Sequence, residues 1–244
     1  MRTNNPMLND KAFAVPATGA DAMTINGTVH KTAGLLFLLV CSGAYTWTVA
    51  RVDGGAQAMS WAIAGLVAGL IAFFTMLFKR EWSPVLAPTY ALAEGLVLGA
   101  VSAMYEARFH GIVFSAVTLT IGTLGVLLLV YRTGLIKATQ NFKLMIVGAT
   151  GAIAITYVVG WILAMFGREI PYIHQSGPVG IVFSLFVVAI AALNLVLDFD
   201  FIENGAAAGA PRYMEWFAAA GLLVTLVWLY LEILRLLAKL NSRR

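Results

Sequence analysis

Seven runs of about twenty predominantly apolar residues, separated by short polar segments, dominate this sequence. One such run, folded as a helix, crosses the roughly 30 Å hydrocarbon core of a bilayer. Hydrophobic residues make up 60% of the chain and charged residues only 11%, against about a quarter in soluble domains. A β-barrel is excluded because its strands would alternate apolar and polar residues in segments of about ten. We therefore expect an all-α polytopic membrane protein, a bundle of seven transmembrane helices around the last one.

The polar segments set the limits of the spans. The first six expected spans are Thr32–Ala50, Ala58–Phe78, Pro84–Tyr105, Gly111–Tyr131, Leu144–Phe166 and Pro178–Leu197. Residues 1–31 are rich in Asn, Thr and Pro, and we expect them to form a flexible polar N-terminal arm. Residues 32–244 would then form the seven-span membrane domain, because no connecting segment is long enough to hold another domain.

The start of the seventh span has two interpretations. Unbroken apolar character from Trp216 to Leu231 favours one continuous helix that begins at Tyr213. A short interfacial helix followed by a span that begins at Leu222 is the alternative. The first interpretation places Glu215 beside the end of the sixth span, whereas the second places Glu232 near the middle of the seventh.

Basic residues are distributed unevenly between the two sides of the expected bundle. The side of the N-terminus holds nine: Arg2, Lys11, Lys31, Lys79, Arg80, Arg132, Lys137, Lys143 and Arg212. The loops of the other side hold Arg51, Arg108 and Arg168, and a seventh crossing adds Arg235, Lys239, Arg243 and Arg244 to that side. Because Lys and Arg accumulate in cytoplasmic loops, the sequence predicts a cytoplasmic N-terminus.

Carboxylates inside the spans are the candidate functional groups, because an ionisable side chain in hydrocarbon is costly unless it faces protein or water. Glu94 lies near the middle of the third span. It either hydrogen-bonds neighbouring helices or takes part in an ion or proton pathway. Gly95 and Gly99 beside it have the spacing of small residues that permits close helix packing.

The densest acidic cluster closes the sixth span and contains Asp198, Asp200 and Glu203. Asp198 and Asp200 point about 200° apart on a helix, so that only one of them can face the bundle. Simple solvation at the membrane interface is one interpretation of the cluster. Negative charge at a helix C-terminus opposes the helix macrodipole, however, and this favours a bound cation, a proton or a buried partner.

The last span offers Glu215 and Glu232 as partners for these aspartates. About 25 Å of helix separates the two glutamates, so they cannot both be level with the acidic cluster. Glu232 has an alternative role, which is a weak surface ion pair with Arg235 three residues later. The sequence leaves open which glutamate is the partner.

Residue patterns typical of enzymes or metal sites are absent from the sequence. Cys41, the only cysteine, lies in an apolar run and is typical of a packed side chain. His30, His110 and His174 lie at span edges or in loops and lack the spacing of metal ligands. We therefore expect no resident cofactor and no firm metal site. The net charge of +4 indicates contact with the anionic lipid of a bilayer and gives no argument for nucleic acid.

In its motifs the chain resembles the transmembrane Bax inhibitor motif proteins, particularly their bacterial branch. The likeness covers nearly everything after about residue 30. It rests on the seven-span hydropathy and on three segments in the same order: Ala93-Glu94-Gly95-Leu96-Val97-Leu98-Gly99, Phe199-Asp200 and Leu229-Tyr230-Leu231-Glu232-Ile233-Leu234-Arg235-Leu236-Leu237. In that family the sixth and seventh spans each contribute an aspartate, and the two share a proton and gate a pH-sensitive calcium leak.

The resemblance implies that Asp200, or Asp198, is the sixth-span member of such a pair and Glu232 the seventh-span member. The chain departs from the family because its last-span acid is Glu and because the two positions lie further apart in the sequence. The implied function is a pH-sensitive Ca²⁺ leak channel in the bacterial inner membrane, gated by carboxylates among Asp198, Asp200, Glu215, Glu232 and Glu94. Ca²⁺ or protons would be the permeant or regulatory ions, and Asp198 and Asp200 the candidate Ca²⁺ contacts. The alternative is a non-transporting modulator of a membrane-bound protease or stress-response complex.

Overall fold

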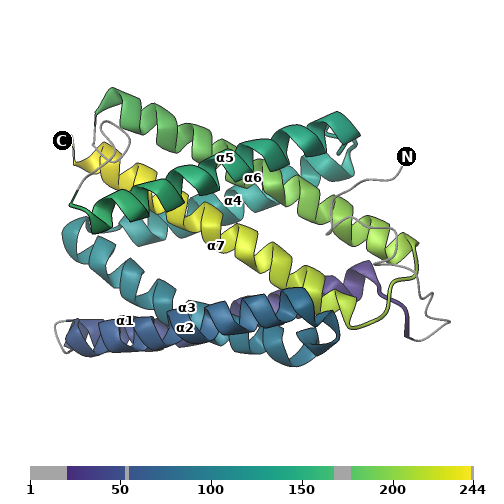
Figure 1. The fold of residues 1–244 in the computed structure, drawn as a ribbon, viewed down its shortest axis with the longest axis horizontal. Helices are drawn as coiled ribbons and strands as arrows, with labels where there is room; N and C mark the ends of the chain where they lie inside the picture. Colours follow the sequence, from purple (N-terminus) through teal and green to yellow (C-terminus); the bar gives the residue numbers. More distant parts are fainter. Residues whose placement is uncertain (1–20, 53–54, 168–176, 243–244) are drawn as a thin grey trace. The chain divides into compact units, whose positions relative to one another are not determined.

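The computed structural model describes residues 21–52, 55–167 and 177–242 (Figure 1). These residues form α1 (Ile25–Val52), α2 (Ala56–Phe78), the 3₁₀ turn η3 (Arg80–Trp82), α3 (Ser83–Arg108), α4 (Ile112–Arg132), α5 (Gln140–Met165), α6 (Pro178–Ala207) and α7 (Met214–Asn241). All seven α-helices have the length and the apolar composition to cross a membrane, α3 together with η3. The prediction of an all-α, seven-span membrane protein is confirmed.

Two compact units make up the described residues, and α3, α6 and α7 contribute to both. The first unit takes its residues from 21–104 and 200–223, and the second from 105–199 and 224–242. In the first unit α1 and α2 lie side by side (Figure 1). In the second unit α5 packs on α6 through Ile146, Ile153, Val187 and Ile190, and Trp228 of α7 covers this cluster.

The seven helices differ in how much of their apolar surface is covered by protein. In the most apolar window of α7, 72% of the residues are buried, compared with 11% in α1 and in α5 and 17% in α4. Side chains such as Phe37, Phe114 and Trp161 are exposed on these outer helices. A membrane helix presents exposed apolar side chains to lipid, so α1, α4 and α5 offer lipid-facing surface while α7 is the most enclosed helix.

α1 begins at Ile25 and not at Thr32, where the first span was expected to start. Thr24 explains the earlier start, because its side-chain Oγ1 accepts a hydrogen bond of 2.9 Å from the backbone N–H of Gly27. This geometry is that of an N-cap, which satisfies a free donor in the first helical turn. The last residues of the expected polar arm, up to Lys31, are therefore helical, and residues 1–20 lie outside the described part of the chain.

α7 is one continuous helix, as the unbroken apolar character of its sequence predicted. It starts at Met214, next to the predicted Tyr213, and runs to Asn241. Gly221 lies inside it without a break. The alternative of a span that begins at Leu222 is wrong.

α6 runs past Leu197, where the sixth span was expected to end, and ends at Ala207. Gly209 follows in the left-handed region with φ 66°, which glycine adopts without steric cost. The backbone N–H groups of Gly209 and Ala210 donate to the carbonyls of Ala206, at 3.2 Å, and of Gly205, at 3.0 Å. These two bonds make a Schellman motif and leave only a short connection before α7.

The small residues of α3 bring its backbone against α1. A Cβ atom on Gly95 would overlap the carbonyl group of Leu39 and the side chain of Ser42, and one on Gly99 would overlap the carbonyl of Gly43. Larger side chains at these two positions would push the helices apart. The predicted close packing at Gly95 and Gly99 is confirmed.

Candidate functional site

Asp198 lies on α6 with its carboxyl group packed towards α7 in the second unit. The Thr225 side chain of α7 hydrogen-bonds to this carboxyl. The Oδ2 atom of Asp198 is buried and has no hydrogen-bond partner in the described part of the chain. A buried polar atom without a partner costs about 1–3 kcal/mol, and more if the group is charged. A hydrogen-bond donor, a proton on the carboxyl itself or a cation would each satisfy such an oxygen atom.

Glu232 on α7 is buried at 1% exposure and is held by two other side chains. The Tyr157 hydroxyl of α5 donates to Glu232 Oε1 at 2.9 Å. Arg235 Nη1 donates to the two Glu232 oxygens at 2.9 and 3.0 Å and to the Tyr157 hydroxyl at 2.7 Å. The ion pair with Arg235 that the sequence suggested is present, but Glu232 is buried in it, so the pair is not the weak surface contact that was considered. Because the Tyr157 hydroxyl of α5 bonds to both groups of this pair on α7, the contact links α5 to α7.

Asp198 and Glu232 do not form a hydrogen-bonded pair with each other. Asp198 is bonded to Thr225, which precedes Glu232 by seven residues of α7. At a rise of 1.5 Å per residue, this separation is about 10 Å along the helix. Each carboxyl thus has its own partners.

Asp200 follows Asp198 by two helical residues and belongs to the first unit. It is half-buried, and its backbone carbonyl accepts a hydrogen bond of 2.8 Å from Asn204 Nδ2. Because α6 is helical through both aspartates, the predicted angular offset of about 200° holds.

Glu215 in the first turn of α7 is bound by residues of α1 and of the segment before it. Its Oε1 accepts hydrogen bonds from the backbone N–H of Thr24 at 2.8 Å and from the Thr24 hydroxyl at 2.9 Å. Its Oε2 forms an ion pair with Lys31. The carboxylate is 2% exposed, and the N-terminal position on α7 favours its negative charge. Glu215 therefore ties the first helix to the last.

Glu94 is half-buried in α3 and is hydrogen-bonded to Tyr90, one turn earlier in the same helix. Its carboxylate faces α2 at a small residue, since a Cβ atom on Gly69 would lie 3.7 Å from Glu94 Oε2. These contacts are those of a carboxyl between packed helices.

A family model confirms the resemblance inferred from the motifs. The model of the Bax inhibitor 1-like family matches residues 5–242. The chain belongs to this family. No curated protein and no solved structure matches the chain.

Sequence reasoning missed several polar partners in this Bax inhibitor 1-like protein. Tyr157 left a signal, because a tyrosine inside an apolar span needs a partner for its hydroxyl group. Thr225 left none, since threonines in membrane helices usually bond to their own backbone. Lys239 was expected on the side of the membrane opposite the N-terminus, together with the other C-terminal basic residues. It lies in α7 at 7% exposure and donates to Ser184 Oγ at 2.8 Å and to the Gly180 carbonyl at 3.0 Å.

Metal-ligating side chains do not gather in the described residues, where no group of three His, Cys, Asp or Glu could hold an ion. An ion at Asp198 would meet one carboxylate. Its other ligands would be neutral oxygen atoms or water, which Ca²⁺ accepts.

Proposed function

We propose that this Bax inhibitor 1-like membrane protein is a leak pathway for cations, with Ca²⁺ as the candidate ion, and that protonation of Asp198 closes it. The observation that carries the proposal is the buried Asp198 Oδ2 atom, which lacks a hydrogen-bond partner among the described residues. Membership of the family supports the same function, because the resemblance drawn from the sequence implies a pH-sensitive calcium leak.

A single carboxyl group can act as such a gate because its two protonation states bind different things. The protonated group is neutral and can donate a hydrogen bond, so it is tolerated inside a span. The ionised group attracts a cation, and carboxylate and hydroxyl oxygens are the hard ligands that Ca²⁺ prefers. Since Thr225 of α7 contacts the carboxyl, a change of protonation state acts directly on the contact between α6 and α7.

Glu232 has a different role in this proposal. Arg235 compensates its charge and Tyr157 bonds to it, so Glu232 holds α5 and α7 together. The shared proton that the resemblance implies for a pair of acids is then carried by Asp198 alone. Asp200 and Glu94 stay as secondary candidates for titrating groups.

Ca²⁺ flux into proteoliposomes of the purified protein, measured against pH, tests the proposal. Asp198→Asn keeps the size of the side chain and removes the titrating group, so we expect it to abolish most of the pH dependence. Asp200→Asn is the matched control, and we expect a smaller effect from it. This order reverses the one suggested by the resemblance, because Asp198 carries the buried unpartnered atom.

Two outcomes would refute the proposal. Superimposable curves of flux against pH for the wild type and Asp198→Asn would show that Asp198 does not gate the flux. Wild-type protein without any flux would refute the leak and favour the alternative, a modulator of a membrane-bound protease or stress-response complex.

The proposed location is a bacterial inner membrane with the N-terminus in the cytoplasm. The distribution of basic residues supports this orientation.

A further inference from the structure

A pocket of about 830 Å³ opens in the first unit, where several spans begin or end. Its walls come from the segment before α1 and the first turns of α1, from the start of α3, from the connection between α6 and α7, and from the first turn of α7. A volume of this size is typical of sites for small ligands. The residues that line it carry charges and aromatic rings.

One wall of the pocket binds a carboxylate of the protein itself, that of Glu215. Thr24 and Lys31 hold Glu215 there, so the charges of Lys31 and Glu215 compensate each other. An ammonium group has three donors, and within the described residues Lys31 uses one of them, on Glu215. Lys31 Nζ also lies 5.4 Å from the ring centroid of Trp216, a cation–π contact.

Arg212 gives the pocket a positive charge that no acidic side chain among the described residues pairs with. The residue is exposed, and its guanidinium has no partner in the part of the chain that the structure describes. Its backbone N–H donates to the carbonyl of Asp21 at 2.8 Å, which fixes the residue at the pocket. A guanidinium binds a phosphate group through two parallel hydrogen bonds. His30, which is also exposed on the lining, adds ring nitrogen atoms that can form hydrogen bonds.

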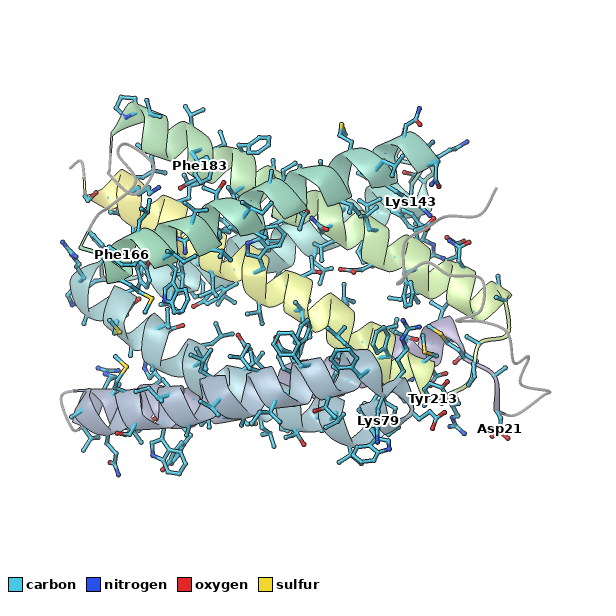
Figure 2. All side chains as sticks on the ribbon, viewed as in Figure 1. Asp21, Lys79, Lys143, Phe166, Phe183 and Tyr213 are labelled. Carbon is cyan, nitrogen blue, oxygen red and sulfur yellow. The ribbon has the colours of Figure 1, made fainter. Side chains whose placement is uncertain are left out.

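The pocket lies where α1 and α7, two helices long and apolar enough to span a membrane, begin, and we infer that it lies at the level of the lipid headgroups. Tyr213 and Trp216 line it, and such aromatic residues concentrate at the membrane–water interface. Figure 2 shows Lys79 and Tyr213 at this same end of the first unit. Arg80, next to Lys79 in the sequence, lies 5.3 Å from the ring centroid of Phe217, which follows the pocket residue Trp216 in α7.

We propose that this pocket binds the phosphate-bearing headgroup of an anionic phospholipid. Arg212 contacts the phosphate group, and the remaining donors of Lys31 contact its oxygen atoms. The acyl chains lie on α1, where Phe37, three residues after Gly34, is 68% exposed. The proposal is independent of the leak function, because no residue of the pocket belongs to the second unit.

Native mass spectrometry of the full-length protein, released from neutral detergent micelles, measures the binding of phosphatidylglycerol and of phosphatidylcholine. We expect the wild type to retain phosphatidylglycerol about tenfold more strongly, because the second lipid has no net charge. Arg212→Gln should weaken phosphatidylglycerol binding about tenfold, the effect of one charged hydrogen-bonded contact. Arg132→Gln, at the end of α4 in the second unit, is the matched control and should leave the affinity unchanged.

A second variant tests the pocket by its shape and leaves its charge intact. Gly34 lines the pocket, and a Cβ atom there would meet no other atom within 4 Å. Gly34→Leu should therefore fold and block lipid binding, whereas Gly122→Leu, equally unobstructed in α4, should not. Unchanged lipid retention in both Arg212→Gln and Gly34→Leu would overturn the proposal. Equal retention of the two lipids would overturn it too, as would inorganic phosphate that displaces phosphatidylglycerol at equal concentration.

Discussion

Replacing Tyr157 by phenylalanine removes one hydroxyl group from α5 and leaves the ring in place. The hydroxyl donates to Glu232 Oε1 at 2.9 Å and accepts from Arg235 Nη1 at 2.7 Å, so two bonds to charged groups are lost. Hydrogen bonds between membrane helices contribute about 0.6 kcal/mol on average and up to about 1.7, whereas bonds to charged groups reach about 1.5–3. Because Glu232 is fully enclosed, we expect a loss of about 1.5–2 kcal/mol in the free energy of unfolding.

A double-mutant cycle isolates the contribution of this bond. Tyr157→Phe, Glu232→Met and the double variant are compared by reversible unfolding in mixed micelles, and we expect a coupling free energy of about 1–1.5 kcal/mol. Tyr45→Phe is the control, since Tyr45 is 49% exposed and contacts Trp61 through its ring. If Tyr157→Phe lowers the free energy of unfolding no more than Tyr45→Phe does, and the cycle is additive, the link between α5 and α7 does not contribute to stability.

Three further predictions concern packing, charge and orientation. Gly95→Ala should lower the free energy of unfolding by about 1–3 kcal/mol, because the new methyl group meets the backbone of α1. Gly122→Ala, with open space around it, should raise the free energy of unfolding by about 0.5–1 kcal/mol. Equal effects of the two variants would contradict the close packing. Glu215→Gln should cost about 1–3 kcal/mol in the same unfolding assay, since it leaves Lys31 without its counter-charge, and a cost below about 0.5 would show that the ion pair contributes nothing. A cysteine at position 140, where Gln140 is exposed, should resist impermeant thiol reagents added outside the cell in a Cys41→Ala background; efficient labelling there would invert the proposed orientation.

The spans could be predicted because the thickness of the bilayer fixes the length of an apolar run. The helix ends could not, since each depends on a single capping group. Thr24 starts α1 within a segment that has the composition of a flexible arm. α6 continues through Gly205 and ends before Gly209, and the sequence does not distinguish the two glycines as helix stops.

The charged residues of the site could be predicted and their partners could not. Glu232 and Asp198 stand out because ionisable groups are rare in hydrocarbon. The residue that faces each of them depends on the register between antiparallel helices, and many side chains contribute to that register. The sequence leaves open whether Glu215 or Glu232 is the partner of the sixth-span aspartates, whereas the structure pairs Glu215 with Lys31, 184 positions earlier.

Backbone hydrogen bonds hold the short segment before α1 against the connection between α6 and α7. Ala22 forms an antiparallel bridge with Pro211, and the N–H of Met23 donates to the carbonyl of Ala210 at 2.6 Å. The bond between Thr24 and Glu215 spans 191 residues of sequence. At about 5–20 residues per second, a ribosome needs roughly 10–40 s to make that stretch, so α1 enters the bilayer long before its partner exists. Lys31 spends this interval without its counter-charge, and the first helix acquires its final anchor only when the last helix is made.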